Sequence, residues 1–454
     1  MTKRLSIVGI GYVGLSTAVG FAIKGYQVYA LTHNSEKAQK INQGIPPFHE
    51  PDLQKNLQEA VNKKMLKCTA KDADMILNTD ITFVATGTPS KSDGSIELKY
   101  IKETAKEIGT KLRKKQSYHL VVVKSTVVPG TTERILKPII EKSSGKQCGK
   151  DFGLCMNPEF LRQGAALQDT LNPDRVVIGE FDKRSGETLF NLYRDFYGSD
   201  TPILRTSLST AEMIKYASNA FLATKISFIN TIANICEQVP NVDVKKVAEA
   251  MGLDKRIGKA FLNAGIGYGG SCFPKDVKAL IAFSEEVGYE PILLKSTETV
   301  NQAQPNRVVQ LCKNLLGDLN GKSIAILGLA FKPETDDMRE ARAIPIINKL
   351  LQEGAKVIVY DPVAIPTART IFKEKIRYAV SAIDCLKNAD CCILVTEWDE
   401  FKNLTSEDFR KNMKKPILID GRRIYNPEKF SQKIFFKAIG LGNKSENTRA
   451  KELV

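Results

Sequence analysis

Short apolar runs alternate with longer helical stretches over the first 200 residues of the chain. Residues 5–10 and 27–31 are strand-like runs, and residues 15–23 between them form an apolar helical stretch. Further strand-like runs follow at residues 81–85 and 120–123. Strands that alternate with helices in this way are typical of a doubly wound parallel sheet.

The pattern changes after this region and then returns. Residues 209–300 contain few strand signals and show a long helical periodicity, which predicts a helical middle domain. Residues 322–331 open a second strand–glycine–helix unit, and residues 357–361 supply its second strand. Other strand candidates lie at residues 391–396 and 416–420. The fold class is therefore predicted to be α/β, with two Rossmann-like doubly wound domains joined by a helical domain.

Domain boundaries follow from these changes. We expect an N-terminal domain at residues 1–200, a central helical domain at 201–300 and a C-terminal α/β domain at 301–440. The remaining residues, 441–454, are predicted to form a polar, mobile tail. A chain of 454 residues is too long for a single hydrophobic core, which agrees with two or three domains.

Composition places the chain among ordinary globular proteins, with 43% hydrophobic and 26% charged residues. No segment approaches eighteen uninterrupted apolar residues, so no membrane span is expected. Residues 1–4 lead straight into a strand-like run and lack the features of a signal peptide. Nine cysteines without a regular framework fit reduced thiols in the cytoplasm. With no C-x-x-C pair and three histidines, no metal site is expected.

The formal net charge of +15 raises the possibility of nucleic-acid binding. The basic residues are scattered, however, their short clusters stand among acidic neighbours, and no nucleic-acid recognition motif accompanies them. We therefore expect no nucleic-acid partner. The charge also fits a protein that handles polyanionic small molecules, such as dinucleotides or nucleotide sugars.

A glycine-rich turn, G-I-G-Y-V-G at residues 9–14, joins the first strand to the first helix. This strand–turn–helix–strand order predicts a dinucleotide site, in which the glycines permit a tight turn and close approach of the pyrophosphate. The second strand of an NAD-binding fold normally ends in Asp or Glu, but here Thr32 stands at that place. His33 and Lys37 could attract a 2′-phosphate. We expect NAD as the cofactor, and NADP is not excluded.

The sequence G-Y-G-G-S-C-F-P-K-D at residues 267–276 places Cys272 after a glycine-rich loop and before a predicted helix. Pro274 suits the first helical position, and a thiol near a helix N-terminus is stabilised as the thiolate. Asp276 follows four residues later on the same helix face. The pattern indicates covalent catalysis on a carbonyl carbon. The alternative is a buried structural thiol.

Three motifs, in this order along the chain, resemble those of the UDP-glucose 6-dehydrogenase family: G-I-G-Y-V-G, G-Y-G-G-S-C-F-P-K-D and G-L-A-F-K-P-E-T-D-D-M-R-E. Further matches are K-S-T-V (124–127), N-P-E-F-L-R (157–162), K-Y-A-S-N-A-F (215–221) and D-G-R-R (420–423). The resemblance extends from residue 3 to about residue 427. It implies oxidation of a primary alcohol to a carboxylate by two hydride transfers, with two NAD per UDP-glucose. It also implies a central domain that forms a homodimer and a C-terminal domain that grips UDP.

The chemistry of such a four-electron oxidation agrees with the residues present. A thiolate at Cys272 can capture the intermediate aldehyde as a thiohemiacetal, and hydride loss then gives a thioester that water cleaves. Lys215 and Asn219 stand four residues apart on a predicted helix and suit a developing alkoxide. By resemblance, Glu159 is linked to thioester hydrolysis and Thr126 to cofactor and catalytic water.

The resemblance implies three sets of site residues. The catalytic set is Cys272, Lys215, Asn219, Asp276, Glu159 and Thr126. The cofactor set is Gly9, Gly11, Tyr12, Val13, Gly14, Thr32, Lys37, Thr88, Thr126, Gln163, Lys275 and Arg339. The substrate set is Glu159, Phe160, Leu161, Arg162, Gln163, Lys215, Asn219, Arg256, Phe261, Leu262, Asn263, Ala264, Gly265, Gly269, Lys332 and Arg422. Arg256 would reach the sugar nucleotide of the partner subunit, and Gln163 replaces the glutamate that the family usually carries there.

Two alternatives remain at this point. A sibling dehydrogenase would act on GDP-mannose or a UDP-N-acetylhexosamine, but Phe273 followed by Lys275 and Asp276 favours UDP-glucose. A two-electron hydroxyacid dehydrogenase would need neither Cys272 nor the C-terminal domain. Two reduced cofactors per substrate indicate the first class of enzyme, and one indicates the second.

Overall fold

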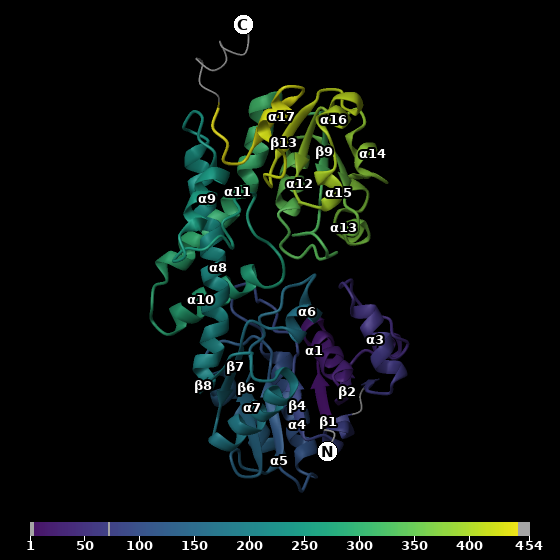
Figure 1. Cartoon of the computed structure of the whole chain (residues 1–454), viewed down its shortest axis with the longest axis vertical. Coiled ribbons are helices and arrows are strands. Elements are labelled where there is room, and N and C mark those ends of the chain that lie inside the picture. Colours follow the sequence, from purple (N-terminus) through teal and green to yellow (C-terminus); the bar gives the residue numbers. More distant parts are fainter. Residues whose placement is uncertain (1–3, 71–72, 444–454) are drawn as a thin grey trace. The chain divides into compact units, whose positions relative to one another are not determined.

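The computed structural model describes residues 4–70 and 73–443, and the chain divides after Ser218 into two compact units (Figure 1). Helix α8 (Leu208–Cys236) begins before this division and ends after it. No helix among the described residues is both long and apolar enough to cross a membrane.

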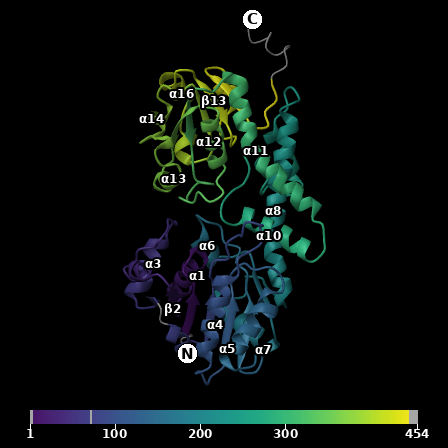
Figure 2. The ribbon, with the colours of Figure 1, turned by 180° about the vertical axis from the view of Figure 1, so that it is seen from behind.

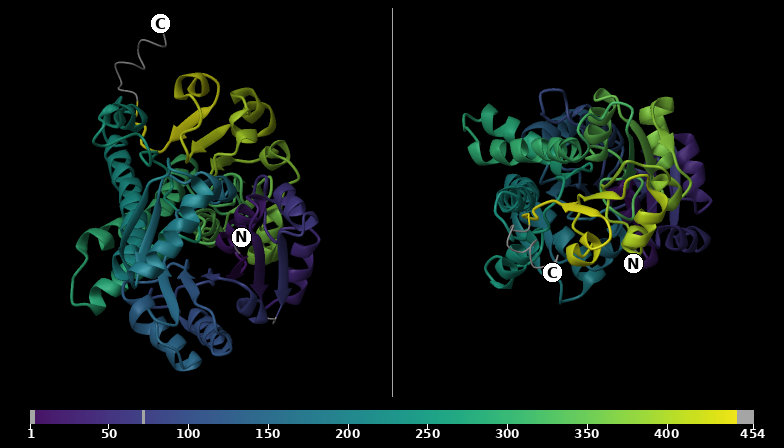
Figure 3. Two further views of the ribbon diagram at one scale, coloured as in Figure 1. Left: turned by 60° about the horizontal axis from the view of Figure 1, so that its bottom comes forward. Right: turned by 90° about the horizontal axis from the view of Figure 1, so that it is seen from above.

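The first unit is built on an eight-stranded sheet with the order β3-β2-β1-β4-β5-β6-β7-β8 (Figure 3, left, purple to teal). The strands are β1 (Arg4–Val8), β2 (Gln27–Thr32), β3 (Leu66–Ala70), β4 (Ile81–Val84), β5 (His119–Val123), β6 (Phe152–Met156), β7 (Val176–Glu180) and β8 (Ile203–Ser207). All neighbours are parallel except β6 and β7. The first six strands therefore have the Rossmann order 3-2-1-4-5-6, as predicted.

Helices cover both faces of this sheet because right-handed crossovers lead in opposite directions from β1 and β4. They are α1 (Tyr12–Ile23), α2 (Ser35–Asn42), α3 (Leu53–Asn62), α4 (Lys99–Leu112), α5 (Lys137–Ser144), α6 (Ala166–Leu171) and α7 (Lys183–Tyr197), with short helices η1 (Ala73–Asn78) and η2 (Thr131–Leu136). Helix α1 packs against α6, and α4 packs against α5 (Figure 2). Helix α1 begins three residues before the predicted stretch, directly after Gly11.

The second unit contains a six-stranded, wholly parallel sheet with the order β11-β10-β9-β12-β13-β14. Its strands are β9 (Ser323–Leu327), β10 (Lys356–Tyr360), β11 (Arg377–Tyr378), β12 (Cys391–Leu394), β13 (Ile417–Asp420) and β14 (Phe435–Ala438). This order repeats the Rossmann pattern of the first sheet. The prediction of two doubly wound α/β folds is confirmed.

The helices of the second unit are α9 (Val244–Leu253), α10 (Phe273–Glu286), α11 (Ile292–Leu316), α12 (Ala343–Gln352), α13 (Ile365–Phe372), η3 (Lys373–Lys375), α14 (Ala382–Leu386), α15 (Asp399–Lys402), α16 (Ser406–Asn412) and α17 (Pro427–Ser431). Residues 208–322, all of them described, contain helices and loops but no strand. The predicted helical region, which follows β8 and precedes β9 along the chain, is therefore present.

The predicted tail needs a correction at its start. Leu441 forms a β-bridge with Asp243, and the N–H of Gly442 donates to the carbonyl of Val242 at 2.8 Å. Residues 441–443 therefore belong to the fold, because backbone hydrogen bonds pair them with the loop before α9. The rest of the predicted tail, residues 444–454, lies outside the described residues.

Candidate active site

The glycine-rich turn after β1 has one open position between two crowded ones. A Cβ atom on Gly9 would lie 2.6 Å from the carbonyl oxygen of Ala85, and one on Gly14 would lie 1.9 Å from the carbonyl oxygen of Gly9. A Cβ atom on Gly11 would meet nothing within 4 Å. Gly11 precedes α1, and no side chain caps the N–H groups of that helix end. The turn therefore has both the room and the donors that a dinucleotide pyrophosphate needs.

The end of β2 lies beside this turn, since the N–H of Gly9 donates to the carbonyl of Leu31 at 3.0 Å. Thr32 is the last residue of β2, and its hydroxyl accepts a hydrogen bond from the N–H of Asn34 at 3.4 Å. The side chain of Asn34 caps α2 through the N–H of Lys37. Burial lowers the pKa of the Lys37 ammonium. Thr32 thus occupies the position at which NAD-binding folds carry a carboxylate.

A buried ion pair links Glu159, on the loop after β6, to Lys215 on α8. The ammonium of Lys215 lies 3.0 Å from a carboxylate oxygen of Glu159, and both side chains are buried. The other oxygen of Glu159 accepts from the N–H of Leu161 at 2.6 Å. Burial raises the pKa of Glu159, but the charge of Lys215, the N–H of Leu161 and the charge of Lys124 outweigh it, so that the pKa is lowered. Glu159 is therefore held as a carboxylate.

Lys124 was not among the predicted site residues, although it opens the K-S-T-V motif at the end of β5. Its ammonium donates to Asn157 Oδ1 at 2.8 Å. Burial lowers the pKa of Lys124 to about 8, although the charge of Glu159 raises it. A lysine directly after the five buried residues of β5 is the signal that marks it, because the carboxyl ends of parallel strands are where ligands bind.

The loop between β6 and α6 carries five predicted substrate contacts, Glu159, Phe160, Leu161, Arg162 and Gln163. The guanidinium of Arg175 stacks on the ring of Phe160 at 4.0 Å. Arg162 forms two side-chain hydrogen bonds to Asp169, at 3.0 and 2.6 Å. Internal contacts therefore hold Phe160 and Arg162 in place before any ligand binds.

Thr126 lies between β5 and η2, and the predicted cofactor contact Thr88 lies beside it. The hydroxyl of Thr88 donates to the backbone carbonyl of Thr126 at 2.8 Å. The neighbouring hydroxyl, of Ser125, donates to the carbonyl of Thr86 at 2.7 Å. These bonds join the loops that follow β4 and β5, next to the glycine-rich turn of β1 in the sheet order.

Cys272 stands at the N-cap position of α10 and is partly exposed. Its carbonyl accepts from the N–H of Asp276 at 2.8 Å, which closes the first turn of the helix. The prediction that Pro274 is the first helical residue is wrong by one position, because α10 begins at Phe273. None of the N–H groups in the first turn of a helix has a partner within the helix. Proline, which has no N–H group, therefore fits the second position as well as the first.

Asp276 is 1% exposed, and each of its oxygens has a partner. Asn219 Nδ2 donates to Oδ2 at 2.6 Å, and the ammonium of Lys275 donates to Oδ1 at 2.6 Å. Asn219 on α8 and Lys275 therefore meet at Asp276, on the helical turn that begins with Cys272. Lys275, predicted to contact the dinucleotide, is paired with this carboxylate.

Buried amides from two helices hold the glycine-rich loop that leads to Cys272. Asn301 Oδ1 accepts from the N–H of Tyr268 at 2.8 Å, and Asn301 Nδ2 donates to the Tyr268 carbonyl at 3.2 Å. Asn230 Oδ1 accepts from the N–H of Gly265, and Gln304 Nε2 donates to its carbonyl, at 2.8 and 2.9 Å. All three amide residues are fully buried. None of the three was among the predicted site residues, because no spacing along the chain distinguishes a buried amide in these helices from an exposed one.

The predicted sugar-nucleotide contacts of the second unit lie on loops around this support. The segment Phe261, Leu262, Asn263, Ala264 and Gly265 precedes α10, and the side chains of Leu262 and Ala264 are buried in the core. Arg422 Nε donates to the carbonyl of Val395 at 2.7 Å. A Cβ atom on Gly269 would lie 2.3 Å from the carbonyl oxygen of Glu340, so this position accepts no side chain.

Three predicted cationic contacts differ in exposure and partners. Arg339 pairs with Asp337 at 2.6 Å, and its side chain is 60% exposed. Arg256 pairs with Asp254 at 2.6 Å, and its side chain is 90% exposed. The ammonium of Lys332 lies 5.8 Å from the ring centroid of Phe331.

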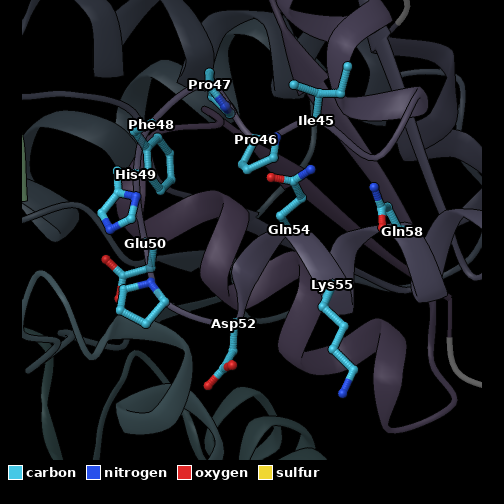
Figure 4. A pocket seen from close by; sticks show the side chains of 11 residues that line it. Ile45, Pro46, Pro47, Phe48, His49, Glu50, Asp52, Gln54, Lys55 and Gln58 are labelled. Atoms are coloured by element: carbon cyan, nitrogen blue, oxygen red, sulfur yellow. The ribbon is translucent and has the colours of Figure 1, made fainter. Parts of the chain in front are cut away.

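A pocket of about 780 Å³ lies in the first unit, against α3 and the segment that connects α2 to α3 (Figure 4). Residues 45–52, Gln54, Lys55 and Gln58 line it. None of these residues was predicted to belong to a site. The ring of Phe48 stacks on that of Tyr12 with a centroid distance of 3.9 Å.

Comparison with known proteins identifies the family. Sequence models of the UDP-glucose/GDP-mannose dehydrogenase family match residues 3–197 (NAD binding domain), 209–303 (central domain) and 325–427 (UDP binding domain). The UDP-glucose 6-dehydrogenase AglM of Haloferax volcanii is 48% identical over 423 residues, which cover 93% of this chain and 97% of the relative. The UDP-glucose 6-dehydrogenase TuaD of Bacillus subtilis is 40% identical over 426 residues, 94% of this chain and 90% of the relative.

Solved structures agree. A UDP-glucose dehydrogenase from Pyrobaculum islandicum has a TM-score of 0.90 and 39% identity, covering 97% of this chain and 98% of that chain. A UDP-D-ManNAc dehydrogenase from Pyrococcus horikoshii has a TM-score of 0.85 and 28% identity, covering 96% and 99%. The open glycine-rich turn lies within residues 3–197, which match the NAD binding domain of the family. NAD is the cofactor. The chain belongs to the UDP-glucose/GDP-mannose dehydrogenase family.

Proposed function

We propose that this chain oxidises UDP-glucose to UDP-glucuronate in two hydride transfers. The observation that carries the proposal is the partly exposed thiol of Cys272 at the start of α10, beside Asp276 with its partners Asn219 and Lys275. Curated relatives that are 38–48% identical over nearly their full length are UDP-glucose 6-dehydrogenases.

The cofactor site is assigned to the glycine-rich turn. NAD, when bound there, supplies the hydride acceptor for both oxidations. The open position at Gly11 leaves room for the pyrophosphate. The N–H groups at the start of α1 have no side-chain cap and can donate hydrogen bonds to its negatively charged oxygens.

Cys272 is assigned as the nucleophile. Its thiolate sulfur forms a bond to the carbon of the aldehyde, and the carbonyl electron pair moves to the oxygen, which takes up a proton to give a thiohemiacetal. Loss of a hydride and of that proton leaves a thioester. Water then adds to the thioester carbon, and the C–S bond breaks with its electron pair on sulfur. The carboxylate leaves, the Cys272 thiolate is restored, and the two protons of the water are released.

Lys215 and Asn219 are assigned to the developing oxyanion. They lie one turn apart on α8, so their side chains project from the same helix face. The ion pair with Glu159 orients the ammonium of Lys215. Glu159 and Thr126 are assigned to the water that cleaves the thioester.

A homodimer through the central helices is part of the proposal. Phe221, Phe228 and Ile235 recur every seven residues on α8 and are 65%, 49% and 55% exposed. Such an apolar stripe fits the same stripe of a second copy. Arg256, exposed on the loop after α9, is assigned to the partner's sugar nucleotide. Sedimentation of the Phe228→Glu variant tests the dimer, which this buried charge would dissociate.

We also infer the domain roles and the compartment. Residues 1–200 bind the dinucleotide, 201–300 dimerise and carry the catalytic helix, and 301–440 bind the sugar nucleotide. A cytoplasmic location is supported by the eight buried cysteines, which stand as thiols outside any disulfide.

The decisive experiment counts reduced cofactor per product. Purified protein receives UDP-glucose, GDP-mannose or a UDP-N-acetylhexosamine, each with NAD or NADP. Two NADH per UDP-glucuronate are expected. One NADH with free aldehyde as the product would contradict a thioester route, and faster turnover of another sugar nucleotide would move the proposal to a sibling activity.

Cys272→Ser is expected to abolish turnover while the protein stays folded. Serine would form a hemiacetal or an ester, and water does not cleave these as readily as it cleaves a thioester. Cys236→Ser, at a buried cysteine in α8, is the matched control and is expected to retain activity. Near-normal turnover of Cys272→Ser would return this residue to a structural role.

A further inference from the structure

The segment between α2 and α3 contacts the cofactor turn on one side. The ring of Phe48 stacks on the ring of Tyr12 with a centroid distance of 3.9 Å and an interplanar angle of 27°. Tyr12 is the first residue of α1 and directly follows Gly11, the open position of the glycine-rich turn. The placement of Phe48 is therefore tied to the residue that borders the pyrophosphate site.

Two residues later, the same segment contacts the substrate loop. Glu50 is 6% exposed, and its two carboxylate oxygens accept hydrogen bonds from the N–H groups of Gly164, at 2.9 Å, and Ala166, at 2.6 Å. Hydrogen bonds to an ionised acceptor are about twice as strong as neutral ones. Glu50 is more than 100 residues away in sequence, and it fixes the point where the loop enters α6.

The loop also contacts Arg175, which stacks on Phe160, but two of its other contacts stay within the loop and α6. Arg162 bonds Asp169 on α6, and the N–H of Ala165 donates to the carbonyl of Arg162, so both ends of these bonds move together. Glu50 instead ties the loop to a separate segment. Figure 4 shows Phe48, His49 and Glu50 in succession along one side of the pocket that this segment forms with α3.

We propose that Glu50 is a positioning residue for the substrate loop 160–165. Because Phe48 stacks on Tyr12, the position of Tyr12 then affects the position of Glu50. The proposal rests on the proposed function, in which this loop contacts the sugar nucleotide. A dinucleotide at the turn restricts Tyr12 and, through the stacked ring, the segment that holds Glu50. Binding of the cofactor then favours the ordered form of the substrate loop, which is a coupling between two ligand sites.

Hydrogen exchange of the full chain tests the coupling without any turnover. Amide exchange is measured over residues 160–168, in the free protein and with saturating NADH. In the native protein NADH is expected to slow this exchange. Glu50→Gln retains the size of the side chain but removes its charge, and is expected to speed exchange in the free protein by about tenfold, the effect of one lost charge-assisted hydrogen bond. It is also expected to abolish the slowing by NADH.

Two further variants separate the two contacts. Phe48→Leu leaves Glu50 in place, so the exchange of the free protein is expected to stay native while the slowing by NADH disappears. Asp52→Asn makes the same chemical change as Glu50→Gln two residues further along, at an exposed side chain, and is expected to behave as the native protein. Native exchange in Glu50→Gln, or intact slowing by NADH in Phe48→Leu, would overturn the proposal.

Kinetics and ligand binding distinguish a positioning role from general loss of structure. Glu50→Gln is expected to raise the KM for UDP-glucose by about tenfold and to change kcat by less than about twofold, because the loop is misplaced while Cys272 is not. Equal loss in kcat would overturn the positioning role. UDP-glucose alone is expected to slow exchange over residues 160–168 in the native protein. If it does not while the Glu50→Gln effect is present, the assignment of the loop fails and the contact of Glu50 stands.

Discussion

The first six strands of the first sheet and the six strands of the second sheet have the same order and the same turn after the first strand, but a different group occupies that turn in each sheet. After β1, the N–H of Gly9 donates to the carbonyl of Leu31 at 3.0 Å, and after β9, the N–H of Gly328 donates to the carbonyl of Tyr360 at 2.8 Å. Both glycines have a positive φ. Each lies close to the residues that follow the strand on its other side in the sheet, Ala85 after β4 for Gly9 and Thr396 after β12 for Gly328. The same backbone turn is therefore built twice.

The difference lies at the end of the neighbouring strand. In the second sheet Asp361 follows β10, and its carboxylate accepts from the N–H groups of Leu329 and Ala330, at 2.7 and 3.1 Å, and from the indole of Trp398 at 3.1 Å. In the first sheet Thr32 stands at this place, and the turn at Gly11 is open. An acidic residue after the second strand therefore indicates a dinucleotide site only where its carboxylate is free. In the second sheet the carboxylate fills the turn itself.

The largest expected effect comes from removing that carboxylate. Asp361→Ala leaves several buried donors without an acceptor and is expected to destabilise the second unit by roughly 4 kcal/mol. Urea unfolding followed by the fluorescence of Trp398, the single tryptophan, measures this. Asp399→Ala removes an 88% exposed carboxylate nearby and is expected to cost less than about 0.5 kcal/mol. Equal stability of the two variants would contradict the assigned role of Asp361.

Alanine at the two turns is expected to separate stability from cofactor binding. In Gly328→Ala the new Cβ would lie 2.5 Å from the backbone nitrogen of Thr396 at a φ of +98°, so a loss of roughly 3 kcal/mol is expected. Gly11→Ala meets no protein atom, so the free energy of unfolding should change by less than about 0.5 kcal/mol. Its dissociation constant for NADH, measured by fluorescence titration, is expected to rise at least about tenfold, since the methyl group occupies the pyrophosphate site.

Acid is expected to weaken the first unit before the second. Burial, with the charge of Lys115 acting in the same direction, lowers the pKa of His119 from 6.5 to about 3. Below pH 6.5 the unfolded chain therefore binds a proton that the folded chain refuses, and stability falls as the pH falls toward 3. The loss at pH 5 is about 2 kcal/mol. All three histidines lie in the first unit.

Thermal unfolding at pH 7.5 and pH 5 checks this difference. Trp398 reports on the second unit, and hydrogen exchange of β1 and β5 reports on the first. The variant His119→Asn, which lacks this titrating side chain, should show a smaller acid shift in the first unit. An acid shift of the same size in both units and in the variant would show that carboxylates, not His119, are responsible.

The smallest expected effect concerns the choice of dinucleotide. Thr32→Asp adds an acceptor for the ribose hydroxyls and a charge that repels a 2′-phosphate, so the preference for NADH over NADPH is expected to rise about tenfold. The ratio of the two dissociation constants is the measurement, and Thr32→Asn, which adds no charge, is the control. An unchanged ratio in both variants would place the ribose elsewhere.

Some strands with a continuous apolar run could be predicted from the sequence, but β6, which is also buried at every position, was not. Strands β4 and β5 are buried at every position, and their predicted bounds differ from the observed ones by one residue. Strand β8 is only partly buried along its length and lies at the edge of the sheet, so no run of apolar residues marks it. The start of α10 was missed by one residue, because a proline fits the first and the second helical positions alike.

The candidate site could be predicted where a motif is local. Cys272 and Asp276 are one helical turn apart, and Gly9, Gly11 and Gly14 form a single turn. The supporting contacts join distant segments: Glu50 reaches Gly164 across 114 residues, and Asn230 reaches Gly265 across 35. No spacing rule marks such pairs, since their proximity depends on how whole strands and helices pack.

The burial of the cysteines has a practical consequence. Eight of the nine thiols are buried, and burial raises the pKa of Cys68 to about 11 and that of Cys385 to about 12, whereas Cys272 is partly exposed. Alkylating reagents act on accessible thiolates, so a maleimide dye has a single target in the folded protein. The amount of dye bound per chain then gives the fraction of intact sites in a preparation. A decrease in the labelling rate when a sugar nucleotide is added measures how much of the substrate site is occupied, without a coupled enzyme assay.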